Sequence, residues 1–483
     1  MSSSAIQTPV PNPSRPPLWL TCALAACLVT GLLRAFLLMN HAPLIALANS
    51  YDEVRYTACF DLYPDRPDTI PPNRNSPEAP FAAYRFVPTD QPMCYWSSEL
   101  LFQGVVVTFY RAQQALADTH SFSVRWIGAL KFAALLLVWM GFSRAWVRRG
   151  EYAPALANGL LLPVLFADPA NSIYLNTFYA EWAALLALYT LCGLVLLSWE
   201  RPASALLRMA LAAAAFALAT SKIQHLALPL VCALIVLGLD FWRSRRWSWQ
   251  GNAILIGALA GLAIQAVQLC RDSEAIRAID VYNRADVTFT GLLPSASDPA
   301  AAAAELGLSP DCLRSLGTRA WQMDNYPDQS CPDLVKVTRG RELALLIHHP
   351  DIGLRLYWHG VLALDPWLAP GLGLVEGGSF QRLPEAFFSL SDVLTASAFL
   401  RALVLGGPIG ALVVLLWPPL GRERPRLLAY TAMSVAIMAA TLGITVLGDG
   451  LADTPKQGHL IFNAALAWWI CLLALGVTKS LRR

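Results

Sequence analysis

Long apolar segments recur along the chain, separated by shorter polar stretches. An apolar α-helix of about 20 residues spans the hydrocarbon core of a bilayer. The pattern therefore predicts an all-α polytopic membrane protein with about ten transmembrane helices. We place them at residues 18–39, 124–143, 152–167, 181–198, 204–219, 226–242, 252–270, 394–417, 427–447 and 460–478.

The composition agrees with this pattern. Of the 483 residues, 56% are hydrophobic and 14% are charged, whereas a soluble domain carries about 25% charged residues. The mean hydropathy is +0.46. The net charge of +3 is small and spread along the chain, which gives no support to a nucleic-acid partner.

Basic residues indicate how the chain is threaded. They cluster between alternate apolar segments, and cytoplasmic loops of membrane proteins are enriched in Lys and Arg. We therefore expect a bacterial inner-membrane protein with both termini in the cytoplasm. The basic residues on that side are Arg144, Arg148, Arg149, Arg201, Arg208, Arg243, Arg245, Arg246, Arg422, Arg424, Arg426, Lys479, Arg482 and Arg483.

The opposite, periplasmic side receives two larger loops. The chain then divides into a disordered tail at 1–17, a transmembrane core at 18–270 with the first loop at 40–123, a periplasmic or interfacial region at 271–393 and C-terminal transmembrane helices at 394–483. Apolar residues at helical spacing predict helices at 97–117, 300–308 and 339–348. Residues 350–374 form an aromatic re-entrant or interfacial stretch in this scheme.

Cysteines lie in pairs in the two larger loops. Cys59 and Cys94 share the first loop, and Cys312 and Cys331 share the second. In an oxidising periplasm we expect two local disulfides, each stabilising the fold by about 3 kcal/mol. Four free thiols are the alternative.

Four polar clusters lie on the periplasmic side, at 49–56, 168–182, 220–225 and 448–459. In the first, Asp52 and Glu53 are adjacent. A carboxylate that is partly desolvated at the membrane surface can act as a general base on a sugar hydroxyl. It could instead hold a divalent cation, Mg²⁺ or Mn²⁺, together with Asp61, or be a solvated loop acid.

The other clusters also leave alternatives open. Glu181 opens an apolar segment, where a carboxylate is costly in hydrocarbon but stabilises a helix start. Lys222 and His225 suit the phosphate of a lipid carrier, although a lysine at a membrane surface can also extend its ammonium group into water. The last cluster, at 448–459, combines acidic, basic and imidazole groups, or is a polar hairpin. No His/Cys spacing typical of zinc appears.

Several stretches resemble the GT-C superfamily of membrane glycosyltransferases, and within it a bacterial family associated with hexosyl transfer to glycans. They are Tyr174–Glu181, Thr220–His225, Phe289–Pro294, Glu305–Leu308 and Gly448–Gly450. The resemblance implies an inverting transfer of a sugar, expected to be a hexose, from a polyprenyl-phosphate donor to a cell-envelope glycan or lipid on the periplasmic face.

The resemblance also implies residue roles. Asp52 matches the first-loop base of these enzymes, with Glu53 as a second candidate because the two acids are adjacent. The donor phosphate would be held by Lys222, His225 and Lys456. The acceptor site would be lined by Tyr51, Asn176, Tyr179, Glu181, Asp449 and His459.

Two other classes remain open at this stage. A flippase or transporter for a lipid-linked glycan would carry charges near the membrane midplane, where the sequence has few, Arg34 and Lys131. A non-catalytic subunit of an envelope glycan machine would not need its loop acids.

Overall fold

A computed structural model describes most of the chain. The described residues are 16–47, 51–65, 80–88, 94–199, 204–245, 248–271, 274–364, 367–368, 374–376, 383–417, 420 and 424–481, without the side chains of Tyr51, Asp52, Ser244, Glu274 and Ala275. The predicted tail at 1–17 lies mainly outside these ranges.

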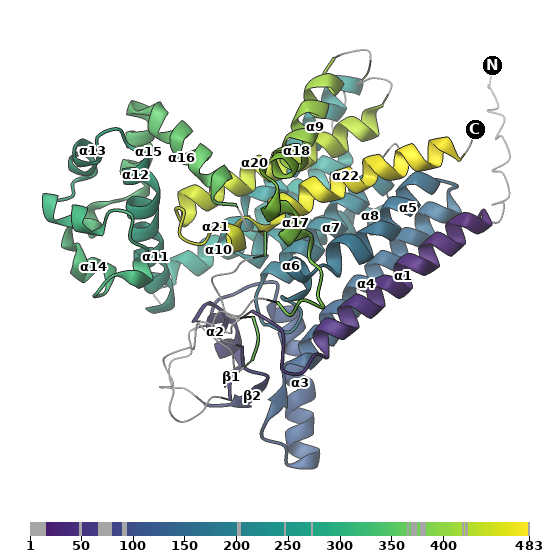
Figure 1. The fold of residues 1–483 in the computed structure, drawn as a ribbon, viewed down its shortest axis with the longest axis horizontal. Helices are drawn as coiled ribbons and strands as arrows, with labels where there is room; N and C mark the ends of the chain where they lie inside the picture. Colours follow the sequence, from purple (N-terminus) through teal and green to yellow (C-terminus); the bar gives the residue numbers. More distant parts are fainter. Residues whose placement is uncertain are drawn as a thin grey trace.

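A bundle of apolar helices forms the body of the molecule (Figure 1). Among the described residues, eight helices are long and apolar enough to cross a membrane, in agreement with a multi-pass membrane protein. They are α1 (Leu18–Met39), α4 (Arg125–Arg148), α7 (Glu181–Ser198), α9 (Ala227–Ser244), α10 (Trp249–Cys270), α18 (Ala398–Leu415), α20 (Pro425–Gly448) and α22 (His459–Ser480).

Two shorter apolar helices occupy the other two positions expected from the sequence. They are α5 (Tyr152–Leu161), which continues as a π-helical turn over Leu162–Phe166, and α8 (Ala205–Ser221). Helix α8 lies between α7 and α10 and packs against both. A count of ten spans stays a prediction.

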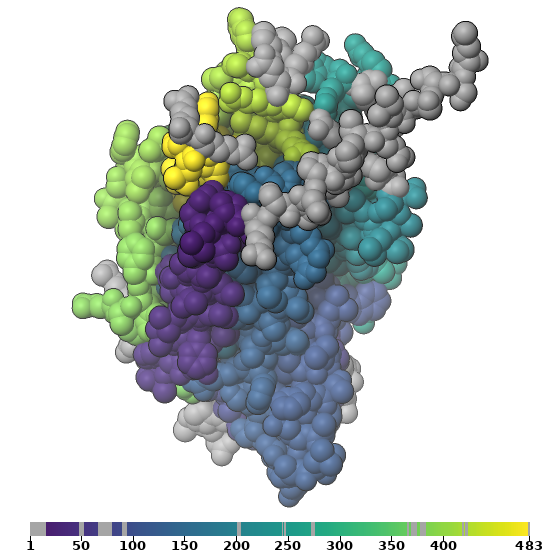
Figure 2. Space-filling view, turned by 90° about the vertical axis from the view of Figure 1, so that its right-hand side faces the viewer, coloured from purple at the N-terminus to yellow at the C-terminus, as the bar shows by residue number. Residues whose placement is uncertain are grey.

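Contacts between helix termini define two ends of the bundle. At one end, Arg149 after α4 donates to the carbonyl of Leu197 at the end of α7, at 2.6 Å. At the other, Arg125 at the start of α4 donates to the carbonyl of Met39 at the end of α1, at 3.2 Å. The start of α1 and the end of α22 share a hydrophobic cluster at the first end, and Figure 2 shows α1 along the outside of the bundle. These contacts agree with alternate threading; the side facing the cytoplasm stays a prediction.

The first long loop contains a small sheet, so the expectation of an all-α chain is wrong in this detail. Its three antiparallel strands, in the order β1-β2-β3, have only two to four residues each, too few for an alternating sequence pattern to be recognised. The elements of this loop are α2 (Tyr51–Thr57), β1 (Leu62–Pro64), β2 (Ala83–Phe86), α3 (Leu100–Ala117) and β3 (Phe122–Ser123). A disulfide joins Cys59 to Cys94, a pair expected from the sequence.

The second long loop forms a helical lobe beside the bundle (Figure 1). Its helices are α11 (Glu274–Asp286), continued by a π-helical segment over Val287–Leu292, then α12 (Leu293–Ser295), α13 (Pro299–Leu306), α14 (Pro327–Ser330), α15 (Arg339–His348) and α16 (Pro350–Leu362). The second expected disulfide, Cys312–Cys331, lies within this lobe. The short helices expected near 300–308 and 339–348 correspond to α13 and α15.

Three short helices complete the described α-helices: α6 (Pro169–Ser172), α17 (Leu390–Ala396) and α21 (Thr454–Gln457). The segment expected as one helix from 394 to 417 is divided into α17 and α18. Ser397 lies between them in extended conformation, and its side chain accepts a hydrogen bond from the backbone NH of Leu400 in the first turn of α18.

Helices α8 and α10 approach closely because α10 carries glycines at the contact. A Cβ atom at Gly257 would lie 2.0 Å from the carbonyl oxygen of Ala212, and one at Gly261 would lie 2.4 Å from the Cβ of Ala219. A backbone atom cannot move aside as a flexible side chain can. The two glycines therefore fix the distance between these helices.

We predict that Gly257→Ala destabilises the protein by about 1–3 kcal/mol, because it overpacks the contact between α8 and α10. The matched control is Gly238→Ala in α9, where a Cβ atom would meet nothing within 4 Å. That change should be neutral or stabilising by up to about 1 kcal/mol, since Ala favours a helix over Gly. Thermal unfolding of both purified variants in detergent measures the difference. Equal melting temperatures would contradict the prediction.

Candidate functional site

Charged and polar side chains gather inside one end of the bundle, where α4, α7, α8 and α22 meet the first loop. In this region three lysines, Lys131, Lys222 and Lys456, are each less than 5% exposed. Each forms an ion pair with a carboxylate. A buried charge requires partners of this kind.

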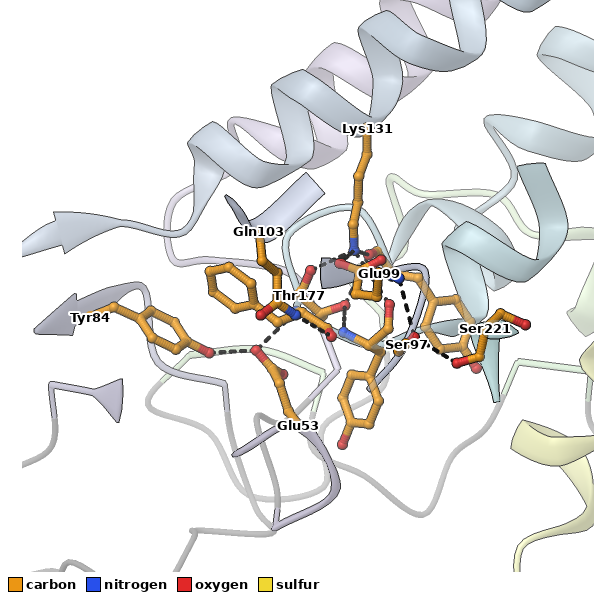
Figure 3. A network of polar contacts seen from close by, with 11 residues as sticks. Glu53, Tyr84, Ser97, Glu99, Gln103, Lys131, Thr177 and Ser221 are labelled. Carbon is orange, nitrogen blue, oxygen red and sulfur yellow. Dashed lines mark hydrogen bonds and ion pairs between the residues drawn. The ribbon is translucent and has the colours of Figure 1, made fainter. Parts of the chain in front are cut away.

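Lys131 is the centre of the first group of contacts (Figure 3). Its ammonium nitrogen on α4 lies 2.7 Å from Oε1 of Glu99, the residue preceding α3. It also donates to the carbonyl oxygens of three residues in the segment before α7, Thr177 at 2.7 Å, Tyr179 at 3.4 Å and Tyr174 at 3.5 Å. One lysine thus joins α3 and α4 to the segment that leads into Glu181.

Glu53 lies on the other side of the same segment. Its Oε1 accepts hydrogen bonds from the Tyr84 hydroxyl at 2.6 Å and from the backbone NH of Phe178 at 2.9 Å. The side chain is buried, and burial raises the pKa of Glu53 to about 7. Burial also raises the pKa of Glu99, to about 8, although Lys131 lowers it. Burial thus favours the protonated form of both carboxyl groups, whereas Lys131 favours the charged form of Glu99.

Glu181 and Lys222 form the second buried ion pair. Their Oε1 and Nζ atoms are 2.5 Å apart, and Lys222 also donates to Oε1 of Gln457 at 3.4 Å. Glu181 starts α7, Lys222 follows α8, and Gln457 ends α21. The pair therefore connects the middle of the chain to its last loop.

The third lysine comes from that loop. Lys456 lies 3.3 Å from Oδ2 of Asp453, and its ammonium group lies 4.9 Å from the centre of the Tyr179 ring, a cation–π contact. Tyr179 is the residue whose carbonyl accepts from Lys131. The three lysines are therefore linked through the segment 174–181.

Two histidines lie beside these pairs. Nδ1 of His225 is 2.9 Å from the Ser221 hydroxyl, and the rings of His225 and His459 have their centres 6.3 Å apart. The His459 ring is 5.6 Å from that of Tyr174. Both imidazoles are buried. The arrangement combines carboxylates, ammonium groups and imidazoles in a small volume shielded from water.

The helical lobe contacts the bundle at the loop after α20. The backbone NH of Leu451 donates to the hydroxyl of Thr290 at 2.9 Å, and a Cβ atom at Gly450 would lie 2.3 Å from the carbonyl oxygen of Asp286. Gly450 also has a φ of +60°, which glycine adopts without strain. The loop that carries Asp453 and Lys456 is thus held directly against the lobe.

An apolar cavity of about 110 Å³ lies deeper in the bundle, among α4, α5, α7, α20 and α22. Asn463 lines it and donates to the carbonyl of His459, one turn earlier on α22, at 2.9 Å. Asn463 also exchanges hydrogen bonds with the amide of Asn171, at 2.7 and 3.0 Å. The cavity therefore begins close to the polar cluster and extends away from it between apolar helices.

The structure brings together most of the candidates named from the sequence: Tyr179, Glu181, Lys222, His225, Lys456 and His459, with Glu53 on the far side of the 174–181 segment. Asp449 is largely buried at the start of the loop that also carries Lys456. Asn176 lies apart, because its amide donates to the carbonyl of Met39 at 2.9 Å and so anchors the end of α1. The side chains of Tyr51 and Asp52 lie outside the described part.

Sequence reasoning missed three members of the site: Tyr84, Glu99 and Lys131. The sequence does contain a signal for one of them, because a lysine within a membrane span requires a buried partner. Its partner Glu99 is 32 positions earlier, at the start of a helix in the first loop. Only the fold shows that these positions meet.

A metal site receives no support from the described residues. They contain no group of three or more His, Cys, Asp or Glu side chains placed to hold a metal ion. The cation site suggested for Asp52 and Asp61 involves a side chain outside the described part.

We predict that stability falls as the pH rises from about 4.5 to 7, partly because of Glu53. Its pKa is about 7 in the folded protein against an ordinary 4.5, so the folded chain holds the extra proton in this range. A single group of this kind changes the unfolding free energy by at most about 1.4 kcal/mol per pH unit. Glu53→Gln, whose amide oxygen can accept the same two hydrogen bonds, should make the melting temperature fall less between pH 5 and pH 7.

The control for this measurement is Glu385→Gln, which changes an exposed carboxyl group. It should leave the pH dependence of the melting temperature as in the unmodified protein. If Glu53→Gln and Glu385→Gln give the same slope, the burial of an ionisable Glu53 is not the cause.

Comparison with known proteins identifies a family. A family model described as the YfdI N-terminal transmembrane domain matches residues 18–360. Searches of curated proteins and of solved structures found no match. The matched range includes Glu53, Glu99, Lys131, Glu181 and Lys222, whereas Lys456 and His459 follow it. Because the match covers well over half of the 483 residues, the chain belongs to the family of the YfdI N-terminal transmembrane domain.

Proposed function

We propose that this membrane protein is a GT-C-type glycosyltransferase. It would transfer a sugar, expected to be a hexose, from a polyprenyl-phosphate donor to a cell-envelope glycan or lipid on the periplasmic face. The observation that carries the proposal is the buried cluster of carboxylates and ammonium groups at one end of an apolar bundle. A lipid-linked sugar phosphate needs both an anion-binding group and a base, next to a membrane.

The lysines supply the anion-binding groups. Lys222 and Lys456 are already held by Glu181 and Asp453, so their ammonium groups are fixed before a ligand arrives. A donor phosphate would add to these contacts or replace the carboxylates, with His225 as a further hydrogen-bond donor. The apolar cavity that begins at Asn463 offers space for part of a hydrocarbon chain.

The transfer would proceed by a single displacement. An acceptor hydroxyl oxygen bonds to the anomeric carbon while the bond from that carbon to the phosphate oxygen breaks. The hydroxyl proton passes to a carboxylate, and the electron pair leaves with the phosphate. The lysines stabilise the charge that develops on the leaving phosphate. Inversion at the anomeric carbon follows from one displacement.

Asp52 is the proposed base, and Glu53 is its neighbour with a positioning role. One carboxylate oxygen of Glu53 accepts from both Tyr84 and Phe178, so this residue ties α2 to β2 and to the segment before α7. Its side chain is only 1% exposed, which leaves little room for an acceptor. The lining of the acceptor site by Tyr179, Glu181, Asp449 and His459 belongs to the same proposal.

We expect Asp52→Asn to lower transfer by about 10²–10⁴-fold, the contribution of a general base. The assay uses purified protein in nanodiscs with a polyprenyl-phosphate hexose, and measures release of polyprenyl phosphate. Asp61→Asn is the control: it should keep activity if Asp52 acts as a base and lose it if the two acids share a cation. Movement of the lipid across the bilayer without release of phosphate would instead favour a flippase.

We also expect Lys456→Gln to raise the KM for the donor by about 10- to 100-fold, because a hydrogen bond to a charged group contributes about 1.5–3 kcal/mol. The matched control is Lys336→Gln, since Lys336 also pairs with an aspartate three positions earlier, Asp333, but on the exposed surface of the lobe. Its KM should not change. A lower melting temperature of Lys456→Gln with an unchanged KM would show a structural role only.

A further inference from the structure

Helix α16 is apolar on two opposite sides. Ile352 and Leu356 on one side are buried, together with Gly360. On the other side, Leu354, Trp358 and Leu362 follow one another at intervals of four residues and are 75%, 60% and 59% exposed. A helix that faced only water on its outer side would carry polar residues there. We call these three residues the outer face of α16.

The polar residues of α16 lie on a third side of the helix, where they contact other residues of the lobe. Arg355 pairs with Asp351 one turn earlier and donates to the hydroxyl of Ser297 at 2.8 Å. Nδ1 of His359 is 3.2 Å from the hydroxyl of Ser295. These contacts orient the helix on the lobe, so the outer face keeps a fixed direction.

The position of α16 connects its outer face to the membrane-spanning surface. At Gly360 the helix lies against the last turns of α20: a Cβ atom there would be 2.5 Å from Cγ1 of Val446 and 3.0 Å from Cδ1 of Leu442. Leu447, the next residue on α20, is itself exposed. Figure 1 shows α16 running from the lobe to the end of α20. The outer face therefore begins where the apolar surface of a membrane span ends.

Helix α15, which precedes α16, also carries exposed apolar residues. Leu343 and Ile347 of α15 are exposed one turn apart, whereas Leu345 is buried on the other side. Arg339, at the start of α15, donates to the carbonyl of Leu447 at 2.8 Å. Helix α15 is thus also attached to the end of α20.

We propose that the outer face of α16, Leu354, Trp358 and Leu362, lies in the interface of the membrane leaflet that borders the lobe. Its partner is the lipid surface rather than another protein. Tryptophan is enriched at membrane interfaces, and an amphipathic helix next to a span reaches that region without moving. A protein partner would have to displace the lipid expected beside the exposed Leu447 at the end of α20.

This contact has a consequence for the lobe. The lobe carries Asp286 and Thr290, which lie against Gly450 and Leu451 of the last loop. Lipid contact on α16 then holds the lobe at a fixed distance from the membrane, beside the polar cluster. The proposal does not depend on the glycosyltransferase activity.

Site-specific photocrosslinking tests the proposal in native membrane vesicles. We would place p-benzoylphenylalanine at Trp358 of the full chain, irradiate, and measure the intact mass of the purified protein. The lipid-contact control is the same residue at Val413, which is 68% exposed on the spanning helix α18. The water-contact control is Arg314 of the lobe, whose exposed side chain pairs with Asp311.

We expect an adduct with the mass of one phospholipid at positions 358 and 413, at a yield several-fold above that at position 314. A phospholipid yield at 358 as low as at 314 would overturn the proposal. An adduct at 358 with the mass of a second protein, whether another copy or a different chain, would also overturn it. Each variant is first shown to elute as a single species, so that a folding defect is not mistaken for absence of lipid.

Discussion

An ammonium group that no water reaches must find all of its partners within the protein, and the site is built around this requirement at Lys131. The energy of leaving such a group unpaired is several kcal/mol. Lys131 therefore fixes at once the position of Glu99 and the path of residues 174–179, through one ion pair and three backbone contacts. The segment that leads into Glu181 has little freedom left.

The rest of the cluster depends on that segment. Tyr179 provides the ring beneath Lys456, Phe178 provides the NH for Glu53, and Glu181 follows directly and pairs with Lys222. The first loop, the middle helices and the last loop are thus held by one short stretch of chain. The small sheet also positions a residue of the cluster, since β2 places Tyr84 against Glu53.

The sequence predicts the positions of the apolar helices well, because length and hydropathy are local properties. The segment at 427–447 corresponds to α20, for example, and 18–39 to α1. It also identifies Glu181, Lys222 and Lys456 as unusual, since charges at the ends of spans stand out. It does not give the pairing of Lys131 with Glu99, which depends on how α3 and α4 cross. The sequence also does not distinguish Asn176, which anchors the end of α1, from its neighbours in the site. An asparagine that binds a backbone carbonyl and one that binds a ligand are the same in a sequence.

The ion pairs of the three buried lysines share an order along the chain. Glu99 comes before Lys131, Glu181 before Lys222 and Asp453 before Lys456. During synthesis from the N-terminus, each carboxylate has therefore left the ribosome before the lysine that will neutralise it. No lysine of the cluster has to wait for its counter-ion to be translated. The linear order of the charges thus matches the direction in which a membrane protein is assembled.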